Sequence, residues 1–170
     1  DEVKIDGAGF ISGDDPRTIS VWAAGQGGNI VSLGDGNTAN KRFSILVDGS
    51  GYVNIIGESN DWGTDYYLSS DVMTHLVVTY DGSGTVSFFV NGEFFSEAQM
   101  DYNTEGDAPV MIGTNTDNRN DEYFQGIIDD VSIWRVALSA SDIQELYENH
   151  SSLWNISNDN VLMAYWSFNE

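Results

Sequence analysis

Two stretches of the chain combine acidic, amide and aromatic side chains in a way that suits ligand binding. The first, ESNDWGTDYY (residues 58–67), offers Asp61, Trp62 and Tyr66. An indole in a polar loop can stack on the C–H face of a sugar, and nearby polar groups can fix its hydroxyls. A second role for Trp62 is equally open, because the indole could instead anchor the loop by packing into a sheet edge.

The second stretch, NTDNRNDEYF (residues 115–124), is rich in oxygen ligands. Carboxylate and amide oxygens suit Ca²⁺ as well as sugar hydroxyls. Asn, Asp and Gly are also the ordinary turn residues, so each loop taken alone could be only a turn. The two stretches together give this predicted ligand-binding set: Asp61, Trp62, Tyr66, Asn115, Asp117, Asn120 and Tyr123.

The sequence offers no arrangement typical of an enzyme. Retaining glycoside hydrolysis needs two carboxylates about 5–5.5 Å apart. The adjacent acidic pairs, such as Asp14-Asp15 and Asp129-Asp130, would point to opposite faces of a strand. The chain has no cysteine nucleophile and no GxSxG motif. We therefore expect no catalytic residues.

The charge balance limits the partners. The chain carries 27 acidic and six basic residues, a formal net charge of −21. Nucleic acid needs clustered Lys and Arg, and an anionic membrane surface would repel such a protein. The acidity could serve only solubility in a salty medium, or some of the carboxylates could hold Ca²⁺.

Other metal chemistry and membrane insertion are disfavoured by the composition. Cysteine is absent and only His75 and His150 are present, which argues against disulfides and zinc. No apolar run approaches the roughly 18 residues of a membrane helix. The opening DEVKIDG lacks the apolar region of a signal peptide, so we expect the chain to be a piece of a larger protein.

Short alternating strands separated by turn residues predict an all-β sandwich. FSILV and YVNII flank one DGSG, HLVVTY and TVSFFV flank a second, and Asn91-Gly92 marks a tight hairpin. One helix is predicted near residues 140–148, because Ser139 and Asp142 form a capping box before Ile143 and Leu146. We expect two antiparallel sheets of about six strands each, in a jelly roll.

Five segments in order carry a family resemblance over roughly the whole chain. They are TISVWAA, HLVVTYDG, VSFFVNGE, VMIGTN and the run FQGIIDDVSIWRVALSASDIQELY from Phe124 to Tyr147. The chain resembles the laminin-G-like domains of the concanavalin A-like lectin/glucanase superfamily. The resemblance implies one jelly-roll domain over residues 1–170. It also implies a non-catalytic carbohydrate-binding or adhesion module of an extracellular or cell-surface protein, with a glycan or a cell-surface or matrix ligand.

Two other functions stay open at this stage. The chain could be a protein–protein recognition or spacer domain, or an accessory domain of a polysaccharide-degrading enzyme. The C-terminal segment, residues 161–170, resembles the opening strand of such domains. It could pair within this domain and complete a sheet, or it could begin a following repeat.

The resemblance also implies a structural Ca²⁺ held by Asp129, with Asp6, Gly7 and Gly9 as its N-terminal partners. Strict alternation would place Asp129 on the core face with Val131 and Ile133, where a carboxylate needs a counter-charge. The alternative is that Asp129 caps a neighbouring turn by accepting backbone N–H groups.

Overall fold

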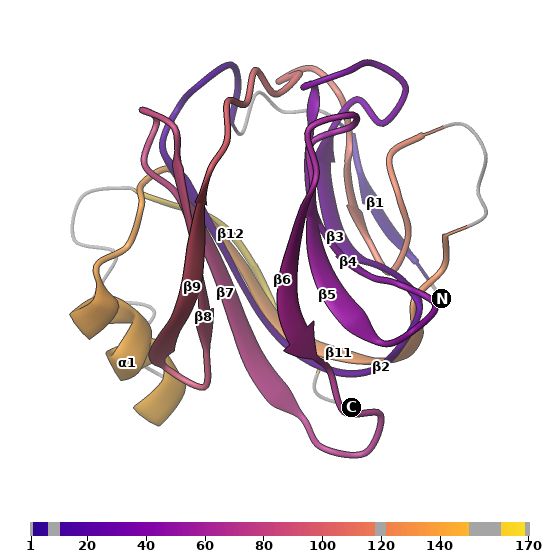
Figure 1. The fold of residues 1–170 in the computed structure, drawn as a ribbon, viewed down its shortest axis with the longest axis vertical. Helices are drawn as coiled ribbons and strands as arrows, with labels where there is room; N and C mark the ends of the chain where they lie inside the picture. Colours follow the sequence, from indigo (N-terminus) through magenta and orange to yellow (C-terminus); the bar gives the residue numbers. More distant parts are fainter. Residues whose placement is uncertain (1, 7–10, 118–121, 150–160, 169–170) are drawn as a thin grey trace.

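Two six-stranded antiparallel sheets face each other in the computed structural model, which describes residues 2–6, 11–117, 122–149 and 161–168 (Figure 1). The first sheet has the order β1 (Val3–Ile5), β10 (Val110–Ile112), β3 (Gly28–Gly34), β4 (Arg42–Val47), β5 (Tyr52–Ile56), β6 (Trp62–Tyr67). The second has the order β12 (Leu162–Trp166), β11 (Gln125–Trp134), β2 (Arg17–Gln26), β7 (Thr74–Tyr80), β8 (Thr85–Val90), β9 (Glu93–Gln99). The predicted all-β jelly-roll sandwich is confirmed.

The main core lies between the sheets, because alternate side chains of each strand point to the same face. Ile19 and Val21 of β2 are fully buried in a cluster that also contains Phe43 and Ile45 of β4. The alternation that identifies the strands in the sequence is therefore the pattern that builds the core.

One end of the core is closed by a buried cation, Arg17. Its guanidinium lies 5.4 Å from the ring centre of Phe43 and 5.2 Å from that of Tyr80. It donates hydrogen bonds of 2.8 Å to the backbone carbonyls of Asp15 and Gly13. Burial lowers the pKa of Arg17 to about 10, although nearby groups including Tyr80 favour the charged form. Among the described residues this side chain joins β2 to the loop before it.

Helix α1 (Ala140–Glu148) begins at the predicted capping box. The Ser139 hydroxyl accepts the backbone N–H of Asp142, and the Asp142 carboxylate accepts that of Ser139. Ile143 and Leu146 then pack in a second apolar cluster with Trp134 of β11. The helix therefore lies on the outer face of the second sheet (Figure 1). The described residues contain no helix long and apolar enough to cross a membrane.

His75 belongs to an aromatic stack on this outer face. Its ring centre lies 5.2 Å from Trp22 of β2 and 6.0 Å from Tyr147 of α1, with the rings nearly parallel. His75 Nε2 lies 2.8 Å from the Ser20 hydroxyl, and the residue is 1% exposed. His75 is therefore a sheet histidine beneath the helix.

Asp129 lies on the opposite face from the one predicted. A β-bulge follows Asp129 in β11, where Asp130 has a left-handed φ of 46°. Asp129 pairs opposite Trp22 of the outer face, whereas Val131 is buried in the main core. The prediction that Asp129 shares the core face with Val131 and Ile133 is wrong, because the bulge changes the alternation.

The C-terminal strand β12 pairs antiparallel with β11 and forms one edge of the second sheet. Asp129 Oδ1 accepts the backbone N–H of Asp130 at 2.8 Å and that of Phe168 at 3.0 Å. The Tyr165 hydroxyl donates to Asp130 Oδ1, and burial together with this bond raises the pKa of Tyr165 to about 12. The C-terminal strand thus pairs within this chain, which is one of the two alternatives that the sequence leaves open. The domain boundaries stay a prediction.

Replacing Ile143 by Ala tests how α1 is held. We expect the variant to lose about 2–5 kcal/mol of unfolding free energy, because it leaves a cavity between the helix and the second sheet. Gln144→Ala changes an exposed neighbour in the same helix and should cost a few tenths of a kcal/mol. Urea denaturation of both variants measures the difference, and equal midpoints would contradict the packing described.

Candidate functional site

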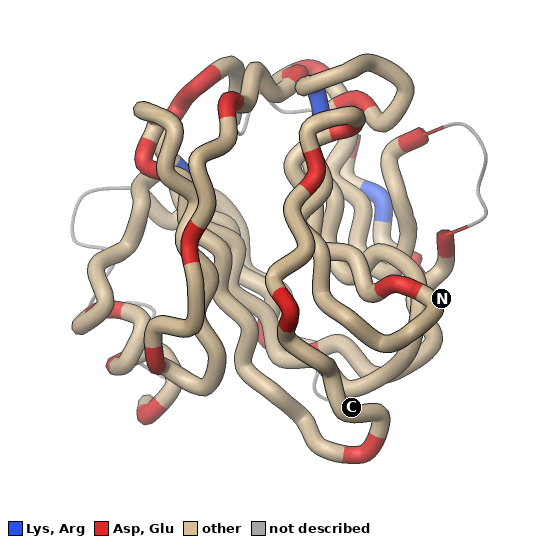
Figure 2. The backbone as a smooth tube through the Cα atoms, in the orientation of Figure 1, with Lys and Arg blue, Asp and Glu red and all other residues tan. Residues whose placement is uncertain are grey.

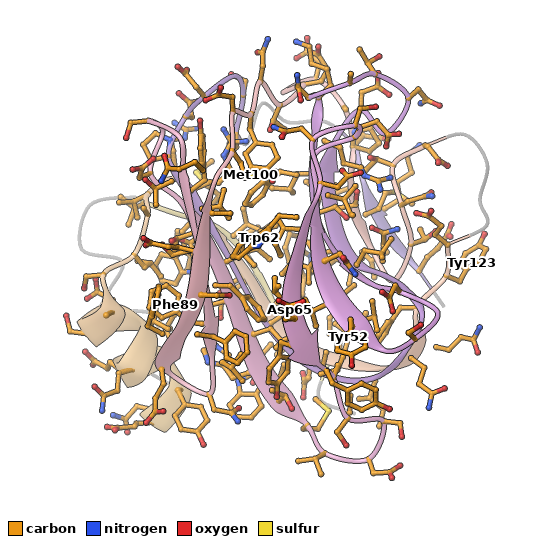
Figure 3. All side chains as sticks on the ribbon, viewed as in Figure 1. Tyr52, Trp62, Asp65, Phe89, Met100 and Tyr123 are labelled. Atoms are coloured by element: carbon orange, nitrogen blue, oxygen red, sulfur yellow. The ribbon has the colours of Figure 1, made fainter. Side chains whose placement is uncertain are left out.

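Trp62 and Tyr66, the two aromatic residues predicted in the first stretch, pack against the main core. Trp62 begins β6, is half-buried, and packs against the main core between the two sheets (Figure 3). Asp61 Oδ1 accepts the backbone N–H of Gly57 at 3.0 Å. Trp62 therefore lies as the anchor alternative requires. Its proposed contact with a sugar is not needed to explain its position.

Alternation along β6 places its two adjacent tyrosines on opposite faces. The pairing of β5 with β6 shifts register here, and Asp65 has a left-handed φ of 63°. Tyr66 points inward, with its ring centre 5.3 Å from that of Phe95. Tyr67 points outward and pairs opposite Tyr52 of β5. Tyr67, which the sequence analysis did not select, is therefore the exposed member of the pair.

Tyr52 and Tyr67 form an exposed aromatic pair on the outer face of the first sheet. They are 45% and 55% exposed, and their rings meet edge to face with centres 5.8 Å apart. Asn54, the next outward residue of β5, pairs opposite Leu46 of β4. An apolar and an amide side chain thus adjoin the two rings.

The turn before β5 holds a carboxylate close to this pair. Asp48 accepts the backbone N–H groups of Tyr52 at 3.0 Å and Ser50 at 2.8 Å. The bond from Tyr52 is the main reason that the pKa of Asp48 lies below its usual range. Asp48 therefore adds a fixed negative charge next to the tyrosines.

Residues 122–124 lie beside the start of β3, where Tyr123 forms an isolated parallel bridge with Asn29. The backbone N–H of Asn29 donates to the Glu122 carbonyl at 2.9 Å, and that of Phe124 donates to the Gly113 carbonyl at 2.9 Å. Gly28 has φ +96°, and a Cβ there would lie 2.3 Å from the carbonyl group of Tyr123. Glycine is thus required for this close approach.

Glu122 is the centre of a polar network beside the bridge between Tyr123 and Asn29. Its Oε2 accepts from Asn29 Nδ2 at 2.6 Å and from Asn115 Nδ2 at 3.0 Å, and lies 3.9 Å from Arg42 Nη2. Arg42 also lies 3.6 Å from a Glu58 carboxylate oxygen. Asn29, Asn115 and Arg42 are buried, whereas the Glu122 side chain is 34% exposed. One carboxylate oxygen is thus held by three buried groups.

Tyr123 completes the site. It is 45% exposed and borders a hollow of about 320 Å³ whose lining includes Leu46, Asp48 and Glu122. Figure 3 shows Tyr52 and Tyr123 beside the first sheet, away from Trp62. We call this surface the tyrosine face, which comprises Leu46, Tyr52, Asn54, Tyr67, Glu122 and Tyr123.

The structure brings together only part of the predicted ligand-binding set. Tyr123 lies on the tyrosine face and Asn115 lies beneath it. Asp117 is buried against Gly36, and Asn120 lies outside the described residues. The missed residues Tyr52 and Asn54 do follow the outward positions of YVNII, so alternation could have identified them.

The structure describes two of the four predicted calcium ligands, Asp129 and Asp6. Asp129 Oδ1 is occupied by two backbone N–H groups, and Asp6 lies 3.5 Å from Lys4 Nζ. Gly7 and Gly9 lie outside the described residues. The described residues contain no group of three His, Asp or Glu side chains suited to a metal. They favour the backbone cap at Asp129, and calcium stays a prediction.

Several solved structures have a similar fold. A putative carbohydrate-binding protein from Bacteroides ovatus gives a TM-score of 0.70 at 17% identity, over 98% of this chain and 48% of that one. The CBM40 of Ruminococcus gnavus IT-sialidase, bound to α2,3-sialyllactose, gives 0.64 at 16% identity, over 86% and 96%. Domain 4 of AbnA, a GH43 extracellular arabinanase from Geobacillus stearothermophilus in complex with arabinotriose, gives 0.61 at 22% identity, over 82% and 69%.

These likenesses show the fold, since every identity is below 25%. The chain spans about half the length of the Bacteroides protein. No curated protein matches the sequence. Residues 2–144 match a family model described as the concanavalin A-like lectin/glucanases superfamily, and the chain therefore belongs to that family.

Proposed function

We propose that this chain is a non-catalytic carbohydrate-binding module whose ligand lies on the tyrosine face. The observation that carries the proposal is the exposed pair Tyr52 and Tyr67 beside Asp48, together with the exposed Tyr123 on the hollow that Asp48 also lines. Exposed aromatic rings beside a few fixed polar groups are the usual composition of a small-molecule site. A sugar presents the matching surface, with C–H groups on its ring face and hydroxyls around it.

The similar structures support this proposal without deciding it. Two of them hold an oligosaccharide, arabinotriose in one and α2,3-sialyllactose in the other. The arabinanase is described as extracellular, which supports an extracellular or cell-surface location for this chain. Protein–protein recognition is the second candidate, because exposed tyrosines are also common at protein interfaces. Binding to isolated glycans distinguishes the two.

Tyrosine substitutions test the location of the ligand. On an array of plant, bacterial and animal glycans, we expect Tyr52→Ala and Tyr67→Ala to weaken binding about tenfold each, or about 1.4 kcal/mol. Phe replacements keep the ring and should largely retain binding. Phe94→Ala removes an equally exposed ring, 55%, from the second sheet and serves as the matched control. Binding that falls with Phe94→Ala but not with the tyrosine variants would place the ligand elsewhere.

The proposal also predicts no glycoside hydrolase activity. The adjacent carboxylates Asp129 and Asp130 accept backbone N–H groups and the Tyr165 hydroxyl, respectively, so neither is arranged as an acid or a nucleophile. Prolonged incubation with arabinan, xylan and β-glucan should release no reducing sugar. Release that is abolished by one Asp or Glu substitution would contradict the assignment.

Calcium binding at Asp129 is tested by thermal melting. If Asp129 holds Ca²⁺, a metal concentration about 100-fold above its Kd would stabilise folding by about 2.7 kcal/mol. The melting temperature should then rise by several degrees relative to EDTA, and Asp129→Asn should reduce the shift. Identical curves with Ca²⁺ and EDTA would leave Asp129 only its role as a backbone cap.

A further inference from the structure

We propose that Glu122 is the specificity-determining acceptor of the tyrosine face, and that it selects uncharged, hydroxyl-bearing sugar chains over acidic ones. The inference rests on the proposed function, since it names the ligand class of the same site. It concerns the carboxylate oxygen Oε1, which projects from a network that fixes the other oxygen.

The first step is the asymmetry of the carboxylate. Oε2 takes both amide donors, Asn29 Nδ2 and Asn115 Nδ2, and lies nearest to the guanidinium of Arg42. Within the described part of the chain, Oε1 accepts no hydrogen bond. A partly exposed carboxylate with one committed oxygen presents the other to a donor from solution, such as a sugar hydroxyl.

The second step is the rigidity of the support. Asn29 is fully buried, and its Oδ1 accepts from the Ser44 hydroxyl of the neighbouring strand. Asn115 is 1% exposed, and its backbone segment is closed by the bond between Phe124 and Gly113. Glu122 therefore loses little conformational freedom when a ligand binds, which favours affinity.

The third step is that the network contains buried polar atoms that make no hydrogen bond to the loop or to the sheet. Arg42 Nε and Asn115 Oδ1 are buried without a hydrogen-bond partner among the described residues. Buried polar atoms are nearly always paired in native structures, and exceptions occur at functional sites. Burying the Arg42 guanidinium is costly, and its contacts with Glu58 and Glu122 offset part of that cost.

The fourth step is the charge around the face. Arg42 is shared between Glu122 and Glu58, and Asp48 lies on the other side of the hollow. Lys41, the residue before Arg42, lies 3.7 Å from Glu105. The described acidic residues greatly outnumber the basic ones over the whole molecule (Figure 2). A uronate, sulfate or sialate would meet net negative charge, whereas a neutral hydroxyl can donate to Oε1.

The test uses an array that pairs neutral oligosaccharides with acidic ones of similar backbone, such as galactan with galacturonan fragments. We expect the wild type to bind neutral members. Glu122→Gln should weaken that binding at least tenfold and raise the ratio of acidic to neutral binding. Glu97→Gln removes an exposed carboxylate from β9 of the second sheet and should change neither. A loop-fastening role alone would not move the ratio.

Each outcome decides a different claim. If the wild type binds no glycan, the proposed function itself fails. If the wild type binds and the tyrosine variants weaken it, but Glu122→Gln behaves like Glu97→Gln, only the role of Glu122 is overturned. If Glu122→Gln melts well below the wild type, a wild-type crystal soaked with the best-binding neutral oligosaccharide decides. A sugar hydroxyl on Oε1 supports the proposal, and a ligand that leaves Oε1 to solvent overturns it.

Discussion

The pairing of Tyr123 with Asn29 at the start of β3 is the constraint on which the site depends. The backbone N–H of Asn29 donates to the Glu122 carbonyl, and the Glu122 carboxylate contacts Asn29 and Arg42, so Glu122 is held by both β3 and β4. The same contacts place Tyr123 beside the hollow and cover Asn29 and Arg42. Gly28 has no side chain, so the backbone of Tyr123 can approach it closely. This close approach allows the polar network around Glu122 to be buried at the start of β3.

Two strands contain bulges, and the one in β11 decides which of its side chains reach the surface. Asp65 and Asp130 both take left-handed φ angles, which L-residues other than glycine rarely adopt. In β6 the alternation still places Tyr66 inward and Tyr67 outward, whereas the bulge at Asp130 moves Asp129 to the outer face while Val131 stays in the core. Strict period-two alternation therefore fails in β11 but holds in β6.

The sequence predicts the features that depend on local patterns better than those that depend on contacts between distant residues. The strands, hairpins and capped helix follow from local patterns, namely alternation, turn residues and the Ser139 box, and the structure confirms them. The site depends on residues far apart in the chain, such as Asn29, Arg42 and Glu122, which meet only through sheet order. Trp62 was selected for its polar neighbours, but they are turn residues around an anchored side chain.

The central claim, that a glycan binds the tyrosine face, is tested most directly by mapping chemical shifts on ¹³C-labelled tyrosine rings. A galactan or arabinan oligosaccharide that binds in solution should be titrated into the protein. The account predicts the largest shifts at Tyr52, Tyr67 and Tyr123, with little change at Tyr80 and Tyr102, which are buried in the core. Shifts centred instead on Tyr66, whose ring packs against Phe95 of β9, would contradict it.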